Sequence, residues 1–170
     1  MIELIGSDRR VLRALLLAAL VSGSTLAQAE VASRMEAFRI TTDAKGKEQA
    51  QPATTTNPGD VIEYRIRYEN TDPKPVTQLA VSGPVPKGTA LVADSVKSPV
   101  KHAKVYSTDG GKSYQAAPVR RKNASGELET VPASEYTAVQ WQVQEPLKQG
   151  APQQFSYRVR VNAVAVPEKK

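Results

Sequence analysis

Residues 57–71 constrain the fold of this chain most, because a Pro-Gly turn leads into an almost regular alternation of apolar and polar side chains. Pro58 and Gly59 fit the two central positions of a type II turn, in which glycine takes the positive φ. The alternation that follows has the two-residue period of a half-buried β-strand. The predicted inward side chains are Ile62, Tyr64, Ile66 and Tyr68, and the predicted outward ones are Val61, Glu63, Arg65, Arg67 and Glu69. The segment therefore predicts an antiparallel sheet with one face in a core and the other in water.

Residues 1–29 have the three parts of an export signal. Arg9, Arg10 and Arg13 form a basic region, residues 14–21 are uncharged and apolar, and residues 27–29 read Ala-Gln-Ala, which matches an A-x-A cleavage site. The apolar run is much shorter than the roughly 20 residues that span a bilayer. We therefore predict a cleaved signal peptide at residues 1–29, no membrane span after cleavage, and a periplasmic or extracellular location.

The predicted mature chain, residues 30–170, has 141 residues, which is the size of one domain. It contains no cysteine, so no disulfide supports the fold and no thiol chemistry is present. The signal peptide holds 3 of the 23 basic and 2 of the 17 acidic residues, which leaves a net charge of +5. Residues 41–56 are polar and cannot bury themselves, so we predict a long surface loop or mobile hairpin there.

Further short alternations follow along the chain, separated by Gly, Pro and Asn turns. Strands are predicted at residues 35–40, 61–69, 76–82, 89–93, 137–143 and 154–162, and a hairpin is predicted at residues 105–114. No window shows sustained helical periodicity. Seven or eight short strands with regular turn signals predict an all-β fold, and an antiparallel β-sandwich more than a barrel.

Several of these turns and strand ends resemble the conserved-repeat family known as domain of unknown function eleven. The motifs are NPGDV at residues 57–61, Asn-Thr after the strand at residues 70–71, and VPKGT at residues 85–89. YSTDGGKSY at residues 106–114, SEYT at 134–137, QW at 140–141 and PL at 146–147 are similar to a single-domain variant in exported bacterial proteins. The resemblance covers about residues 35–161.

This resemblance implies an immunoglobulin-like β-sandwich with an extracytoplasmic, non-enzymatic, adhesive or scaffolding role, and it carries no catalytic residues. Many family members repeat the unit in tandem within large surface proteins. This chain shows one copy and no sorting signal. A periplasmic or freely secreted single domain fits that difference better than a wall-anchored protein.

Few residues of this chain suit catalysis or metal binding. His102 is the only histidine, and we predict that it lies in a solvent-exposed, lysine-rich loop. Without a cysteine no Cys-His pair can form, and without a cysteine or a second histidine we do not expect a zinc site. Asp109 has no acidic companions at alternating positions, so we interpret residues 109–111 as a hairpin turn rather than a calcium loop. We predict no enzyme activity, no cofactor and no metal. Carboxylate pairs of the glycosidase kind are not excluded by the sequence and would come from Glu63, Glu69, Glu127, Glu129 and Glu135.

The basic residues give one suggestion of a binding surface. The candidates are Arg65 and Arg67 on one strand, Arg158 and Arg160 on the last strand, and Arg120, Arg121 and Lys122 in a loop. If the two strands share a sheet, their outward arginines form a cationic face suited to polysaccharide, lipid head groups or an acidic protein. The usual immunoglobulin arrangement places the second and last strands in opposite sheets and would divide this face. The alternative interpretation is ordinary solubilising charge.

The sequence thus predicts an exported β-sandwich module with a structural, adhesive or protein-binding role in the cell envelope or outside the cell. The expected partner is an envelope or secreted protein, or an anionic surface polymer, and not nucleic acid. A carbohydrate-binding accessory domain is one alternative, and it would need exposed aromatic side chains. A periplasmic assembly factor that binds through an edge strand is another.

Overall fold

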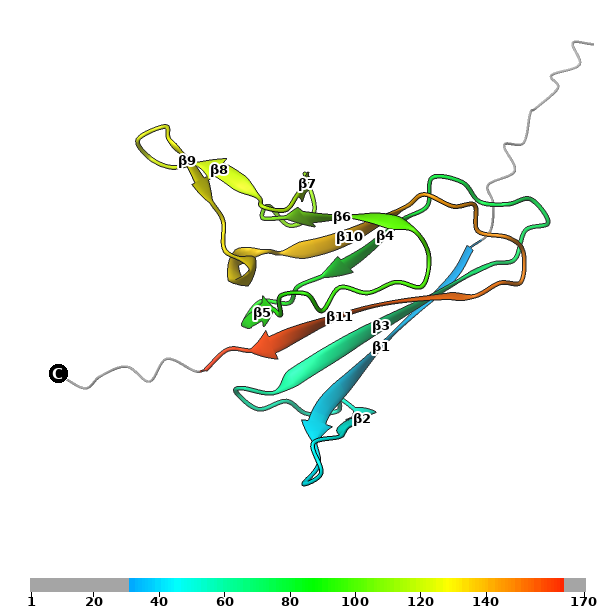
Figure 1. The fold of residues 1–170 in the computed structure, drawn as a ribbon, viewed down its shortest axis with the longest axis horizontal. Helices are drawn as coiled ribbons and strands as arrows, with labels where there is room; N and C mark the ends of the chain where they lie inside the picture. The colour runs from blue at the N-terminus through cyan, green and yellow to red at the C-terminus, as the bar shows by residue number, and fades with distance from the viewer. Residues whose placement is uncertain (1–30, 164–170) are drawn as a thin grey trace, which may run out of the picture.

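The computed structural model describes residues 31–163, so the predicted signal peptide at residues 1–29 lies outside the described residues. Figure 1 shows the strands in an upper and a lower layer, with long loops joining the two layers at the right. The described residues are all-β apart from one short 3-10 helix, η1 (Ala133–Glu135). This confirms the prediction of an all-β fold with antiparallel sheets. Within residues 31–163, no helix has the length and apolar character needed to cross a membrane.

The larger sheet has five antiparallel strands in the order β2-β1-β3-β11-β5. These are β1 (Val31–Thr42), β2 (Glu48–Pro52), β3 (Val61–Asn70), β5 (Thr89–Leu91) and β11 (Gln153–Val161). β3, the strand on which the sequence analysis depends most, lies in the middle of this sheet. The polar segment at residues 41–56 forms the β1–β2 hairpin.

The smaller sheet has four antiparallel strands in the order β4-β10-β6-β7. These are β4 (Ala80–Pro84), β6 (His102–Ser107), β7 (Gln115–Ala116) and β10 (Ala138–Val143). β8 (Arg120–Lys122) and β9 (Leu128–Thr130) form a separate two-stranded hairpin. This hairpin projects at the upper left of Figure 1.

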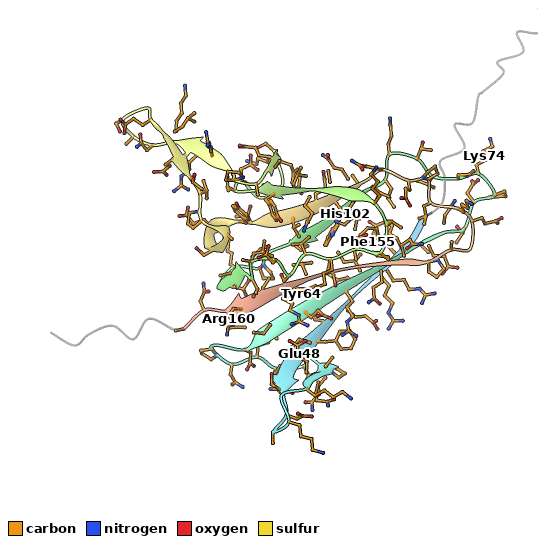
Figure 2. All side chains as sticks on the ribbon, viewed as in Figure 1. Glu48, Tyr64, Lys74, His102, Phe155 and Arg160 are labelled. Atoms are coloured by element: carbon orange, nitrogen blue, oxygen red, sulfur yellow. The ribbon has the colours of Figure 1, made fainter. Side chains whose placement is uncertain are left out.

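One core fills the space between the two sheets. Trp141 on β10 packs against Phe155 and Tyr157 on β11, with ring centroids 5.5 and 6.0 Å apart, and all three side chains are fully buried. Ile62 and Ile66 of β3 are buried beside them, as the alternation predicted. Figure 2 shows Tyr64 and Phe155 on the side of the larger sheet that faces the smaller one. The two packed antiparallel sheets therefore make a β-sandwich.

The predicted turn before β3 is present. Gly59 has φ of 90°, and the amide of Asp60 donates a 3.1 Å hydrogen bond to the carbonyl of Asn57, as a turn over residues 57–60 requires. The amide of Gly59 also donates to the carbonyl of Val161 at 2.9 Å. The turn thus holds the start of β3 against the end of β11.

The strand pattern differs from the prediction in the number of strands and in the bounds of one of them. The described residues form eleven strands rather than seven or eight, because β8 and β9 come from a segment that we predicted as a polar loop and β2 from the segment that we predicted as a loop or mobile hairpin. The strand predicted at residues 76–82 is β4, which begins at Ala80 and ends at Pro84. Proline is tolerated there because β4 is an edge strand.

Candidate binding surfaces

Four of the seven candidate basic residues lie on one face. β3 and β11 are neighbours in the larger sheet, with Ser156 opposite Arg65 and Arg158 opposite Glu63. Alternation along these paired strands places Arg65, Arg67, Arg158 and Arg160 on the outer face, away from the core. The division expected from the usual immunoglobulin arrangement is therefore absent, since the second long strand and the last one pair directly.

Acidic side chains occupy the centre of this outer face. The guanidinium of Arg158 donates to both carboxylate oxygens of Glu48 at 2.7 Å, and its Nε donates to Glu63 at 2.8 Å. Glu63 also accepts a 2.7 Å hydrogen bond from Nε of Arg65. Glu48 lies on β2 and Glu63 on β3, so Arg158 links three strands of the sheet.

This network shifts the pKa values of its members. Partial burial opposes the charged form of Glu63, but hydrogen bonds from Arg158 and Arg65 outweigh it, and the pKa of Glu63 lies below its ordinary value. The hydrogen bond from Arg158 likewise lowers the pKa of Glu48. In return, the hydrogen bond to Glu48 raises the pKa of Arg158. All three groups are charged at neutral pH and neutralise one another in part.

The remaining charges of this face are also mixed. Arg67 pairs with Glu69 at 3.5 Å, and the guanidinium carbon of Arg65 lies 4.3 Å from the ring centroid of Phe38. Arg160 is exposed, and the described residues supply it with a backbone acceptor, the carbonyl of Gly59 at 3.2 Å, and no ion pair. The outer face is therefore a mosaic of both signs rather than a continuous cationic patch.

The other three candidate basic residues lie on β8, in the projecting hairpin. Arg121 donates to Glu129 across the hairpin at 2.7 Å and to Glu135 of η1 at 2.6 Å. Arg120 and Lys122 point to the opposite face, because side chains alternate along a strand. Both are exposed, and neither forms an ion pair with a described residue.

Two residues considered for chemistry have structural partners. His102 is not an exposed loop residue as predicted: it is half-buried at the start of β6, with Nδ1 2.6 Å from the carbonyl oxygen of Val100. Asp109 accepts hydrogen bonds from the side chain and amide of Ser113 and from the hydroxyl of Ser107, and these lower the pKa of its carboxyl. Both residues thus organise the ends of β6.

The aromatic side chains contribute mainly to packing. Trp141 is fully buried, and its indole Nε1 has no hydrogen-bond partner within residues 31–163. Tyr64, Tyr68, Tyr106 and Tyr114 are half-buried, and no aromatic side chain of the described part is classed as exposed. A flat, open aromatic platform of the kind that binds sugars is therefore absent from the described residues.

Among the described residues, one strand edge of the larger sheet is open. β1 pairs with β3 over residues 31–40, but it pairs with β2 only over residues 38–42. The amide of Ala53 donates a 2.9 Å hydrogen bond to the carbonyl of Ala37, so the backbone groups of Ala37 point to the β2 side of β1. Every second residue of a strand in an antiparallel sheet directs its backbone groups to the same side, so those of Ser33 and Met35 point there too. Ser33 and Met35 thus present amide and carbonyl groups with no neighbouring strand among the described residues. Met35 is also one of the two exposed large apolar side chains of the described part.

An apolar pocket of about 140 Å³ opens where residues 144–152 join β10 to β11. Its wall includes Leu79, Val143 and Phe155, and Glu145 and Lys148 are its charged members. The sequence analysis missed both this pocket and the identity of the open edge. Each depends on which strands become neighbours, and alternation within a single strand does not contain that information.

Within residues 31–163, no three His, Cys, Asp or Glu side chains cluster in a way that could hold a metal ion. Comparison of the chain with protein-family models, curated proteins and solved structures found no match in any of the three.

Proposed function

We propose that this protein is an exported, non-enzymatic β-sandwich module that binds a protein partner in the cell envelope or outside the cell. The open edge of β1 is the observation that carries the proposal. A partner strand placed beside residues 31–36 would gain main-chain hydrogen bonds from Ser33 and Met35 and would cover the exposed Met35 side chain. Native proteins ordinarily protect such an edge, because it is a template for pairing with another chain.

We also propose that the module is an immunoglobulin-like variant related to domain of unknown function eleven. The turn and strand motifs support this proposal. The direct pairing of β3 with β11 departs from the usual immunoglobulin strand order. Export rests on the three-part pattern of residues 1–29. Cell fractionation tests it: we expect a protein shortened by 29 residues outside the cytoplasm, and an uncleaved cytoplasmic protein would contradict export.

The binding role is tested by a photo-crosslinking residue placed at position 35 in living cells. We expect a defined protein adduct there and none from position 142, where Gln142 is exposed on the outer face of the central strand β10. Ser33→Pro removes an amide that points to the open edge, where proline is tolerated, so we expect it to abolish the adduct without unfolding the domain. An adduct that is equal at the two positions, or that survives Ser33→Pro, would refute strand addition at β1.

A further inference from the structure

The β8–β9 hairpin is built as a rigid projection. Val119 and Val131 at its base are each 1% exposed, and the amide of Val131 donates to the carbonyl of Val119 at 2.9 Å. Arg121 ties one side of the hairpin to Glu135 of η1. The hairpin is thus anchored in the core at one end and held to the body along one face.

The rigid hairpin displays an apolar side chain in water. Leu128 is 65% exposed, more than any other large apolar side chain of the described residues. Lys122 lies directly opposite it on β8, and Glu127 precedes it in the chain. Leu128 is therefore an apolar knob flanked by Lys122 and Glu127, with a second exposed cation, Arg120, farther along the same face of β8.

The pocket has complementary features. Its volume of about 140 Å³ is close to that of a cavity of about 150 Å³ that accommodates benzene, so it has room for a leucine side chain. Val143, Leu147 and Phe155 in its wall are buried apolar residues, and Glu145 and Lys148 again supply one charge of each sign. The hairpin and the loop that lines the pocket lie at opposite ends of the molecule in Figure 1.

We propose that Leu128 of one copy of this chain inserts into the apolar pocket of a second copy. Lys122 then faces Glu145, and Glu127 faces Lys148, across the contact. Knob and pocket lie on different parts of the surface, so the contact is head-to-tail, and its repetition forms open chains unless the rotation between copies closes a ring. One hairpin covers a small area, so the association is weak and depends on protein concentration.

The balance of charges favours a second copy over a lipid surface. An anionic bilayer attracts clusters of cations, whereas the three cations of the hairpin, Arg120, Arg121 and Lys122, are accompanied by Glu127 and Glu129, and Arg121 is also paired with Glu135 of η1. The pocket mouth likewise has charges of both signs, Glu145 and Lys148. This proposal deepens the binding role proposed above by naming a partner, and it uses a surface separate from the β1 edge.

Analytical ultracentrifugation of the purified mature protein tests the proposal. We expect the weight-average mass to rise with concentration for the wild type. Leu128→Asp, which alters the knob, should lower the association constant about tenfold or more, since it places a carboxylate in an apolar pocket. Ala151 is a half-buried residue of the pocket wall, and Ala151→Phe fills the pocket, so this variant should also lower the association constant. Lys45→Glu reverses an exposed charge in the turn between β1 and β2, away from the hairpin and the pocket, and should leave the association constant unchanged.

Mixing the two variants distinguishes a knob-in-pocket contact from other associations. The Leu128→Asp protein retains its pocket and the Ala151→Phe protein retains its knob, so the mixture should form dimers and nothing longer. If Ala151→Phe disturbs the fold, Glu145→Lys replaces it, with Lys122→Glu as the restoring change in the partner copy. A wild type that stays monomeric at millimolar concentration, or association unaffected by Leu128→Asp, would overturn the proposal. So would Leu128-dependent binding to phosphatidylglycerol vesicles without self-association. None of these outcomes alters the crosslinking expected at position 35, so the binding role proposed above is tested independently.

Discussion

Gly83 on β4 lies against the ring of Tyr157, and its substitution by alanine offers a sharp test of the core. A Cβ added at Gly83 would overlap Cε1 of Tyr157 and lie 2.9 Å from Cζ. The ring cannot move away, because it is fully buried, stacks on Tyr64 at 5.2 Å and donates its hydroxyl to the carbonyl of Pro84. Overpacking of this kind typically costs about 1–3 kcal/mol, and we place Gly83→Ala at the upper end. The smaller entropy of the unfolded alanine chain offsets about 0.5–1 kcal/mol, which leaves a loss of about 2 kcal/mol.

The assay is urea unfolding followed by the fluorescence of Trp141, the single tryptophan of the chain, which is fully buried in the same core. Tyr157→Leu removes the ring atoms that an added Cβ would meet. In that background only the entropy effect remains, so we expect Gly83→Ala to raise the free energy of unfolding by about 0.5–1 kcal/mol, and the two changes should show a coupling free energy of about 3 kcal/mol.

Gly59→Ala is the matched control. Gly59 has φ of 90° and open space around an added Cβ, so alanine there should cost about 1 kcal/mol through backbone strain alone. Tyr157→Leu should leave that cost unchanged. The steric reasoning is refuted if the free energy of unfolding of Gly83→Ala lies within about 0.5 kcal/mol of the wild-type value, the usual range for harmless substitutions. It is also refuted if Gly83→Ala lowers that free energy equally with Tyr157 and with Leu at position 157.

Two further predictions concern the charged networks. Because the folded-state pKa values of Glu48 and Glu63 lie below the ordinary value of 4.5, the unfolded chain binds more protons in acid, and their stabilisation is present above that pH and lost as pH falls through the lower folded values. The urea concentration at the unfolding midpoint should therefore decrease as the pH is lowered below about 4.5. This decrease with pH should be smaller for Arg158→Gln, and an equal decrease in the variant and the wild type would contradict this role of Arg158. Arg121→Ala should speed amide hydrogen exchange in residues 119–131 while β10 and β11 exchange as before. Equal exchange in the variant and the wild type would show that Arg121 does not hold the hairpin.

The inward and outward pattern of the long strands could be predicted because it is a local property. Val139, Trp141, Phe155, Tyr157 and Val159 are buried as the two-residue period predicted. The turn at Gly59 was also predictable, since a positive φ strongly favours glycine. The polar segments that form β8 and β9 were interpreted as loops, and the segment that forms β2 as a loop or hairpin. Their side chains are mostly exposed, and pairing with a neighbour rather than burial makes them strands.

The candidate surface was predicted in part. The sequence identified the outward arginines, and the structure places four of them on one face. The sequence did not show that Glu48, more than a hundred residues earlier, binds Arg158. Nor did it distinguish Leu128 from other residues of a polar loop. Both findings depend on contacts between segments that are distant along the chain.

The sequence by itself determined the all-β class, the inward and outward faces of β3, β10 and β11, and the turn that begins β3, because each follows from side-chain alternation or backbone dihedral preference over a few neighbouring residues. Only the tertiary structure decided that β3 and β11 are neighbours, that acidic side chains lie on the arginine face, and that no other described residues cover the edge of β1, the pocket or Leu128. These depend on strand order, which is settled by the packing of the whole core.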